Sequence, residues 1–399
     1  MSDAVRSVDG MRILHTSDWH IGRTFHGHAT LNALSEVLAA LVAQVRENRV
    51  DVVVVAGDVF DSATPAAPAY TLLTDVLVDL HRTGARVIVT SGNHDSAARL
   101  GFQARLLRDG IDVVTDPRTI GAPITVDDSD GPVRFFGIPY LEPAIVRQHW
   151  PVDADGAPLR TQAQTVAHAM SLVREGMAAH PGRSVVIAHC FAAGVEATAG
   201  LEREVRQGGI DMVPLSVFDG PDYVALGHIH GRQALSERVR YAGAPLHYSF
   251  GEQRKPRGSW LIDLAADGAV SAEWLDLPVP RRLVTLTGAF DELFAPALVA
   301  QHADDWVHAV YTDALPQTEP MRRLREAYPF CALVQHEPVG GVEHDGRSYA
   351  QRLSAAVTDP ERIDAFLAHV REGQGASAAE AELIREVLDD RVRAEALAS

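Results

Sequence analysis

The sequence predicts an α/β fold in which strands alternate with helices and polar side chains gather at one edge of the sheet. Residues 50–58, VDVVVVAGD, form the β-branched apolar run typical of a strand covered on both faces. Residues 31–47 carry apolar side chains at helical spacing. Several of the expected strands end in polar or ionisable residues, and ligands of open α/β sheets bind beyond the carboxyl ends of strands.

Further strands and helices follow along the chain. Residues 70–84 predict a helix that ends at Gly84, and the Asp-, Gly- and Pro-containing stretches 121–132 and 151–160 predict loops. We expect the remaining strands of this region within residues 11–18, 85–95, 133–140, 184–190 and 222–231.

The alternation of strand-like and helix-like segments changes near Pro278 and Pro280. Residues 281–288 and 305–313 then predict strands, with a possible third strand at 331–338. Two amphipathic helices are expected in the tail, at 359–373 and 377–397. We therefore divide the chain into a main α/β domain at 1–280, a small α/β capping domain at 281–348 and a helical tail at 349–399.

Composition limits the class of protein. The chain has 399 residues, 46% of them hydrophobic, and a formal net charge of −17, which disfavours a broad nonspecific nucleic-acid-binding surface. Apolar runs are far shorter than the roughly 20 residues of a membrane helix. The first ten residues lack the apolar stretch of a secretory signal, so we expect a cytoplasmic protein. Cys190 and Cys331 are expected to be buried thiols.

Five short motifs carry the chemistry, each at an expected strand end. They are Asp18-Trp19-His20, Gly57-Asp58-Val59-Phe60-Asp61, Gly92-Asn93-His94-Asp95, Ala188-His189-Cys190 and Gly227-His228-Ile229-His230-Gly231. Each motif alone has an ordinary structural explanation, such as a turn or a core histidine. His228 and His230 form the more specific pair, because side chains two residues apart on an extended segment point the same way.

The residue types indicate a metal site. Carboxylate, amide and imidazole ligands suit Mn²⁺, Mg²⁺, Fe²⁺ or Zn²⁺. Seven candidates exceed the needs of one ion, so we expect two ions that share a bridging carboxylate, as in two-metal phosphoesterases. The candidate ligands are Asp18, His20, Asp58, Asn93, His189, His228 and His230.

In these motifs and their order the chain resembles the calcineurin-like metallophosphoesterase superfamily. The resemblance implies two packed mixed β-sheets flanked by helices. It also implies roles: Asp18, His20 and His230 bind one ion, Asn93, His189 and His228 bind the other, and Asp58 bridges them. His94 would face the phosphate and assist the leaving oxygen, with Asp95 orienting His94.

Flanking sequence narrows the resemblance to the SbcD family of bacterial nuclease subunits. SDWHIGRTFHG, FGIPYLEP and YAGAPLHYSFGEQRKPRG resemble that family, and the last of these stretches contains none of the candidate ligands. Asp61 also resembles the bacterial branch, in which we expect it to tune or orient the site.

The SbcD resemblance implies a Mn²⁺-dependent nuclease, with Mg²⁺ possible, that acts in DNA replication, recombination and repair. It would act as a 3′→5′ exonuclease on duplex ends and as an endonuclease on single strands and hairpins. Residues 281–348 would contact DNA. The tail would bind the SMC-like ATPase SbcC, in a nucleoid-associated heterotetramer built on a homodimer.

Two alternatives remain open. A small-molecule phosphodiesterase or phosphomonoesterase of the same superfamily is favoured slightly by the negative charge, but leaves the residues beyond about 280 unexplained. A metal-degenerate scaffold that only binds a partner ATPase is disfavoured, because no ligand position is missing.

Overall fold

The computed structural model describes residues 10–102, 104–107, 109–148, 150, 152, 156, 158–193, 212–339, 353, 356, 358–370 and 375–398. The chain divides into two compact units, residues 1–283 and 284–399. Half of the residues 151–160, expected as a loop, lie outside the described part of the chain.

Two six-stranded sheets build the first unit. In spatial order the first sheet contains β14 (Val270–Asp276), β13 (Gly258–Leu264), β1 (Met11–Thr16), β4 (Val52–Ala56), β5 (Arg86–Thr90) and β6 (Ile111–Val114). The second contains β11 (Gln233–Ala234), β12 (Val239–Tyr241), β10 (Tyr223–Gly227), β9 (Arg183–His189), β8 (Gly131–Gly137) and β7 (Ile124–Asp128). Both sheets are mixed, since each has four adjacent parallel strands and antiparallel strands at its edges.

Alternate side chains of these strands enter different layers. Val52 and Val54 of β4 pack with Val185 and Ile187 of β9 in a core between the two sheets. Val53 and its alternate neighbours face the opposite way, onto helices. The expected pair of packed mixed sheets flanked by helices is therefore confirmed, and its apolar central strands follow from burial on both faces.

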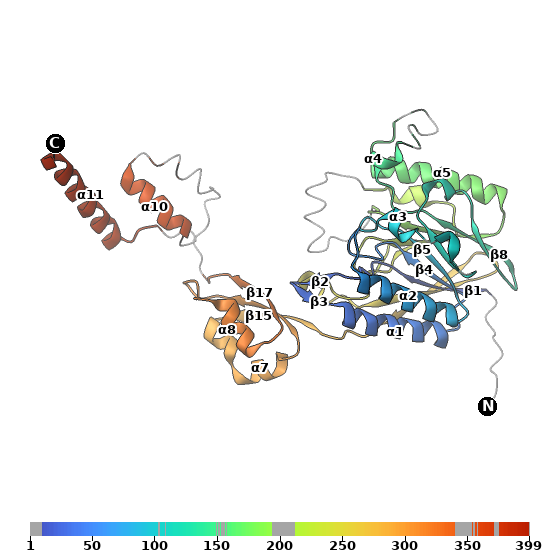
Figure 1. Ribbon diagram of the computed structural model, residues 1–399, viewed down its shortest axis with the longest axis horizontal. Coiled ribbons are helices and arrows are strands. Elements are labelled where there is room, and N and C mark those ends of the chain that lie inside the picture. Colours follow the sequence, from blue (N-terminus) through green and yellow to red (C-terminus); the bar gives the residue numbers. More distant parts are fainter. Residues whose placement is uncertain are drawn as a thin grey trace. The chain divides into compact units, whose positions relative to one another are not determined.

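Helices cover the outer faces. α1 (Leu31–Glu47) and α2 (Ala67–Arg82) pack on the first sheet, and α5 (Gln162–Ala179) packs on the second. In Figure 1, α1 and α2 lie together on one side of the first unit and α5 lies on the other. The unit also has the short helices α3 (Ala97–Leu100) and α4 (Pro143–Val146) and the small hairpin β2 (Thr24–Phe25) and β3 (His28–Ala29).

One loop prediction is wrong. Residues 121–132 were expected as a loop, but Ile124–Asp128 form β7 and Gly131 begins β8. Ile124 and Val126 alternate with polar residues and pack against the core between the sheets, which is the pattern of a short, half-buried edge strand. The turn residues belong only to the hairpin between β7 and β8, where Gly131 has a φ of 104°.

The second unit has its own core around Phe290, Leu324 and Tyr328. It contains β15 (Leu283–Gly288), β16 (Trp306–Tyr311), β17 (Cys331–His336), α7 (Pro296–His302), α8 (Pro320–Ala327), α10 (Asp359–Val370) and α11 (Ala378–Ala398). The possible third strand and both tail helices are thus confirmed. None of the helices in the described part of the chain is both long and apolar enough to span a membrane.

Candidate metal centre

All seven candidate ligands lie at the carboxyl ends of parallel strands. Asp18 and His20 follow β1, Asp58 follows β4, Asn93 follows β5, His189 ends β9, and His228 and His230 follow β10. Because β1, β4 and β5 are parallel neighbours, as are β9 and β10, their ends meet at common edges of the two sheets.

The backbone is strained at the ligand positions. Within the described residues, seven non-glycine residues have positive φ, and four of them are candidate ligands: Asp18 (53°), His20 (46°), Asp58 (49°) and His228 (104°). Such conformations cost free energy and persist at functional sites, where the surrounding structure holds them. Here the Asp18 and His20 amides donate to the carbonyls of Gly57 (3.1 Å) and Asp58 (2.9 Å), which ties the two strand ends together.

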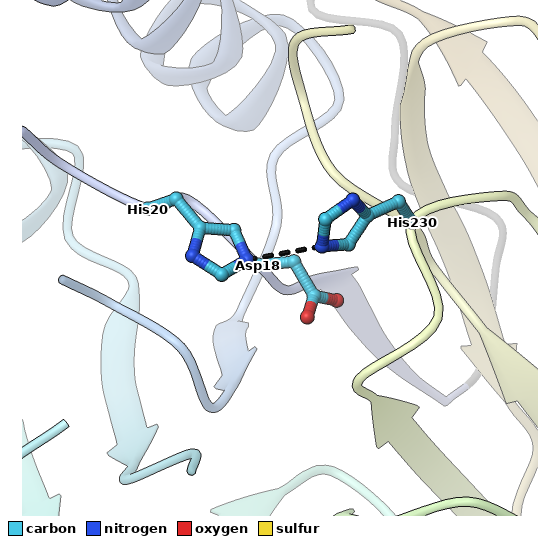
Figure 2. Close-up of side chains that lie close together, drawn as sticks. All are labelled: Asp18, His20 and His230. Atoms are coloured by element: carbon cyan, nitrogen blue, oxygen red, sulfur yellow. Dashed lines mark hydrogen bonds between the residues drawn. The ribbon is translucent and has the colours of Figure 1, made fainter. Parts of the chain in front are cut away.

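Asp18, His20 and His230 form the first donor group, with ligand atoms within 4.8 Å of one another (Figure 2). The Nε2 atoms of the two imidazoles lie 3.1 Å apart. Each Nδ1 faces a carboxylate, since Asp61 Oδ1 lies 3.4 Å from His20 Nδ1 and Glu252 Oε1 lies 3.3 Å from His230 Nδ1.

The two Nε2 atoms are within hydrogen-bonding distance, so a proton on one of them joins the rings in the metal-free protein. An ion that replaced this proton would be held by both nitrogens and by Asp18. The donor set therefore fits a divalent ion.

Asn93, His189 and His228 form the second donor group. The Asn93 Oδ1 lies 3.0 Å from His189 Nε2 and 3.0 Å from His228 Nδ1. His189 Nδ1 donates to the carbonyl oxygen of Ala56 at 2.9 Å, which fixes its proton there. In the metal-free protein its Nε2 faces the oxygens of Asn93 and Asp58, and an ion that replaced the Nε2 proton would be held by the same atoms.

Asp58 faces both groups. Its Oδ2 lies 3.6 Å from His20 Nε2 and 3.3 Å from His189 Nε2, and its side chain is almost fully buried. Burial opposes charge on Asp58 and on His189, but their proximity lowers the pKa of Asp58 and raises that of His189 to about 9. The missing side chain of Gly92 leaves room for this carboxylate, because a Cβ there would overlap it. This placement is what a bridging ligand requires.

His94 lies beside the two donor groups. One of its ring nitrogens, one of His20 and an oxygen of Asp58 lie within 4.8 Å of one another, and 34% of the His94 side chain is exposed. Its Nδ1 donates to the backbone carbonyl of Asp61 at 2.9 Å, and its amide donates to Asp58 Oδ1 at 2.9 Å.

The expected partnership between Asp95 and the His94 imidazole is wrong. The Asp95 carboxylate instead accepts the backbone amides of Val59 (3.1 Å), Phe60 (2.9 Å) and Gly92 (2.8 Å). Burial, together with the nearby charge of Asp58, raises the pKa of Asp95 to about 6 in spite of these amides. Adjacent side chains of a tight turn point apart, so Asp95 fixes the loops while the carbonyl of Asp61 orients His94.

Sequence reasoning missed Glu252 and Arg257. Glu252 is 4% exposed and accepts from Tyr248 N (3.1 Å) and Ser249 Oγ (3.2 Å) as well as facing His230. Burial opposes its ionisation, but His230 and Arg257 lower the pKa of Glu252 to about 2. The signal available was an acidic residue in the 241–255 stretch, which matched the family without containing a ligand.

The two cysteines take no part in the donor groups. Both are free and buried, as expected. Burial raises the pKa of the Cys190 thiol to about 12 and that of Cys331 to about 11, so both stay protonated.

A cleft of about 750 Å³ opens beside the second donor group. Asn93 and His228 line it, together with Arg147, Arg160 and the aromatic rings of Tyr140 and Phe191. Two guanidinium groups against one carboxylate, that of Glu142, make this cleft suited to an anionic ester in a protein of strongly negative charge.

Comparison with known proteins agrees with this geometry. The family model of calcineurin-like phosphoesterases matches residues 11–232. The chain belongs to this family. As a calcineurin-like phosphoesterase it is a metal-dependent hydrolase, and its donor groups lie within the matched region.

A second family model, SbcD_C, described as the type 5 capsule protein repressor C-terminal domain, matches residues 279–370. The two matches, in this order along one phosphoesterase chain, support the resemblance to SbcD-type nuclease subunits.

Similar solved structures include the protein TT1561 of Thermus thermophilus, with 11% identity and a TM-score of 0.37 over 66% of this chain and 99% of that one. A dimetal phosphatase from Danio rerio has 17% identity and a TM-score of 0.36 over 64% of this chain and 93% of that one. A novel archaeal phosphodiesterase has 13% identity and a TM-score of 0.30 over 66% of this chain and 100% of that one.

Proposed function

We propose that this phosphoesterase hydrolyses DNA phosphodiesters with two divalent ions, Mn²⁺ or Mg²⁺, as the nuclease subunit of a complex with an SMC-like ATPase of the SbcC type. The observation that carries the hydrolytic part is the position of Asp58, whose Oδ2 faces His20 in one donor group and His189 in the other. In this proposal Asp18, His20 and His230 hold one ion, Asn93, His189 and His228 hold the second, and Asp58 bridges them.

A bound pair of divalent ions supplies water activation and charge stabilisation for phosphoester hydrolysis. The chain's own residues supply orientation and a proton. Because His94 Nδ1 donates to the Asp61 carbonyl, His94 can give a proton only from Nε2, in the imidazolium form. In this proposal that proton goes to the leaving 3′-oxygen.

Support for DNA comes from the cleft and from the C-terminal family match. Arg147 and Arg160 offer guanidinium groups to backbone phosphates, and Tyr140 and Phe191 offer aromatic rings on which a base can stack. The match over residues 279–370 belongs to a family named after SbcD. Exonuclease action on duplex ends, endonuclease action on single strands and hairpins, and DNA contact by residues 281–348 are parts of this proposal.

The test compares Mn²⁺-dependent cleavage of linear duplex DNA with cleavage of a small chromogenic phosphodiester. We expect the double variant Arg147→Ala, Arg160→Ala to lose at least about tenfold more activity on DNA than on the small ester, because only DNA has flanking phosphates for the arginines. Its matched control is Arg82→Ala, Arg118→Ala, which removes equal charge at exposed positions that do not line the cleft.

Either of two outcomes would contradict the proposal. Efficient cleavage of the small ester with no cleavage of DNA would indicate a small-molecule phosphodiesterase. A chain without a stoichiometric metal pair and without activity on either substrate would indicate a scaffold protein.

Partner binding is proposed from the tail. α10 and α11 expose the apolar side chains of Phe366, Val370, Leu383 and Val387, each at least half exposed. Apolar side chains repeated on exposed helices are typical of a surface that a partner covers. We assign this surface to the SMC-like ATPase, in a heterotetramer that contains two copies of each chain.

A further inference from the structure

We propose that the two metal sites are unequal, and that Glu252 is the positioning residue behind much of the difference. The ion at Asp18, His20 and His230 binds first and is retained, whereas the ion at Asn93, His189 and His228 exchanges with solvent. This inference rests on the proposed two-metal function.

Charge distinguishes the sites. The first is formed by Asp18 and the shared Asp58, and its two imidazoles are backed by the carboxylates of Asp61 and Glu252. Arg23 and Arg257 offset part of this charge, so four carboxylates face two guanidinium groups. The second site has the shared Asp58 and the neutral amide of Asn93, and His189 is backed by the carbonyl of Ala56.

The partner behind an imidazole changes how well the ring binds a cation. A carboxylate that accepts the Nδ1 proton makes Nε2 a stronger donor and fixes the ring, and loss of such a partner costs roughly 10–100-fold in metal affinity. A carbonyl fixes the tautomer but brings no negative charge. In the first site His230 has this stronger kind of partner, because its Nδ1 hydrogen-bonds Glu252 at 3.3 Å, and the Asp61 carboxylate lies 3.4 Å from His20 Nδ1.

Glu252 contacts the first site through His230 and is held there by Arg257. Its Oε2 lies 3.1 Å from Arg257 Nη2, and Arg257 in turn donates through Nη1 to the carbonyl of His230 and to that of Ala244 (3.1 Å). Glu252 and Arg257 thereby hold both the ring and the backbone of His230. The imidazole contacts of the second donor group involve Asn93, Asp58 and Ala56 rather than this network.

Access also differs. In the first site Asp18 and His20 are fully buried and His230 is partly exposed. In the second site His189 is buried, but Asn93 is exposed and lines the cleft with His228. The second donor group therefore borders solvent through the cleft, which the first donor group does not line.

The experiment is calorimetric titration of Mn²⁺ into the full chain after removal of metal, with metal content measured after gel filtration. We expect two resolved binding steps at least about tenfold apart in Kd and one ion retained per chain after filtration. Glu252→Gln should weaken the tight step by roughly 10–100-fold and leave the weak step unchanged. Glu237→Gln, an exposed glutamate of the same charge, is the matched control and should change neither step.

Asn93→Ala is an independent test variant, because an exposed side chain can be removed without disturbing the core. It should abolish only the weak step. Two steps of equal Kd, or loss of the tight step in Asn93→Ala, would overturn the inference. A wild-type chain that binds one tight and one weak ion but cleaves no DNA would contradict the proposed nuclease function and leave this inference intact.

Discussion

At the scale of single residues, the hydrogen bond of His94 decides what this side chain can do. Its Nδ1 donates to the carbonyl of Asp61 at 2.9 Å, so only Nε2 is available for proton transfer to the substrate. Its amide contacts Asp58, but its ring belongs to neither of the two donor groups proposed to hold the ions. In the proposed assignment His94 therefore has a role separate from metal binding.

His94→Ala should retain both ions and lose about 10²–10⁴-fold in kcat on DNA, the range typical of a lost general acid. Metal content by mass spectrometry and nuclease rates with Mn²⁺ measure the two effects on the same sample. Activity within a few fold of wild type would exclude the role of His94 as the proton donor.

For Asp58 we expect loss of metal as well as of activity, since its Oδ2 faces a histidine of each donor group. Asp58→Ala should lose the retained ion and the exchangeable ion together, with activity. Asp75→Ala, an exposed aspartate of α2, is the control and should keep the metal content of wild type. A variant at Asp58 that kept one tightly bound ion would contradict the bridging assignment.

At the scale of elements, His15 joins the two sheets. It lies on β1, and its ring nitrogens contact Tyr223 Oη at 2.8 Å and the Leu226 carbonyl at 3.1 Å on β10. Burial, with a contribution from the charge of Arg240, lowers the pKa of His15 from 6.5 to about 3. The folded protein thus holds this imidazole neutral at pH values where the unfolded chain protonates it.

The sign of the pH effect follows from that difference. Below about pH 6.5 the unfolded state binds a proton that the folded state does not, so stability is full above this pH and falls as the pH drops towards 3. His15 should cost about 2 kcal/mol of unfolding free energy between pH 7 and pH 5. His15→Gln hydrogen-bonds but does not titrate between pH 7 and pH 5. Its unfolding free energy should therefore fall by about 2 kcal/mol less than that of wild type over this interval.

Urea unfolding of wild type and His15→Gln at both pH values, in chelator, measures the difference. The chelator keeps the remaining histidines in the same metal-free state in both proteins. An equal loss of stability in the two proteins would show that His15 does not titrate as its burial requires.

At the scale of the whole molecule, the proposed function gives the two units different roles. The donor groups lie entirely within residues 1–283, and the exposed apolar side chains of α10 and α11 lie in the second unit. Binding of the partner ATPase and hydrolysis should therefore be separable.

Truncation of residues 350–399 should abolish binding to the ATPase while leaving Mn²⁺-dependent nuclease activity unchanged. A subtler variant, Phe366→Glu with Leu383→Glu, keeps the tail helices and replaces two side chains that are 50% and 59% exposed. It should weaken binding by at least about tenfold, because it puts charge into an apolar contact. Pull-down and analytical ultracentrifugation measure the complex, and a complex that survives truncation would place the interface elsewhere.

The sequence by itself determined the fold class and the seven candidate ligands. Each ligand belongs to a short motif at a strand end. Because β1, β4 and β5 are parallel, as are β9 and β10, those ends lie at common edges, and local sequence patterns suffice to predict this. The edge strand β7 was missed, because a five-residue strand with two aspartates and no fully buried side chain resembles a loop.

Only the tertiary structure decided which group contacts the ring nitrogen of each histidine that points away from the proposed ion. Glu252 faces His230 from 22 positions away, and the carbonyl of Asp61, rather than the adjacent Asp95, orients His94. Sequence motifs record which side chains can bind a cation, because strand geometry is local. Orientation and charge depend on partners that packing brings together from distant segments.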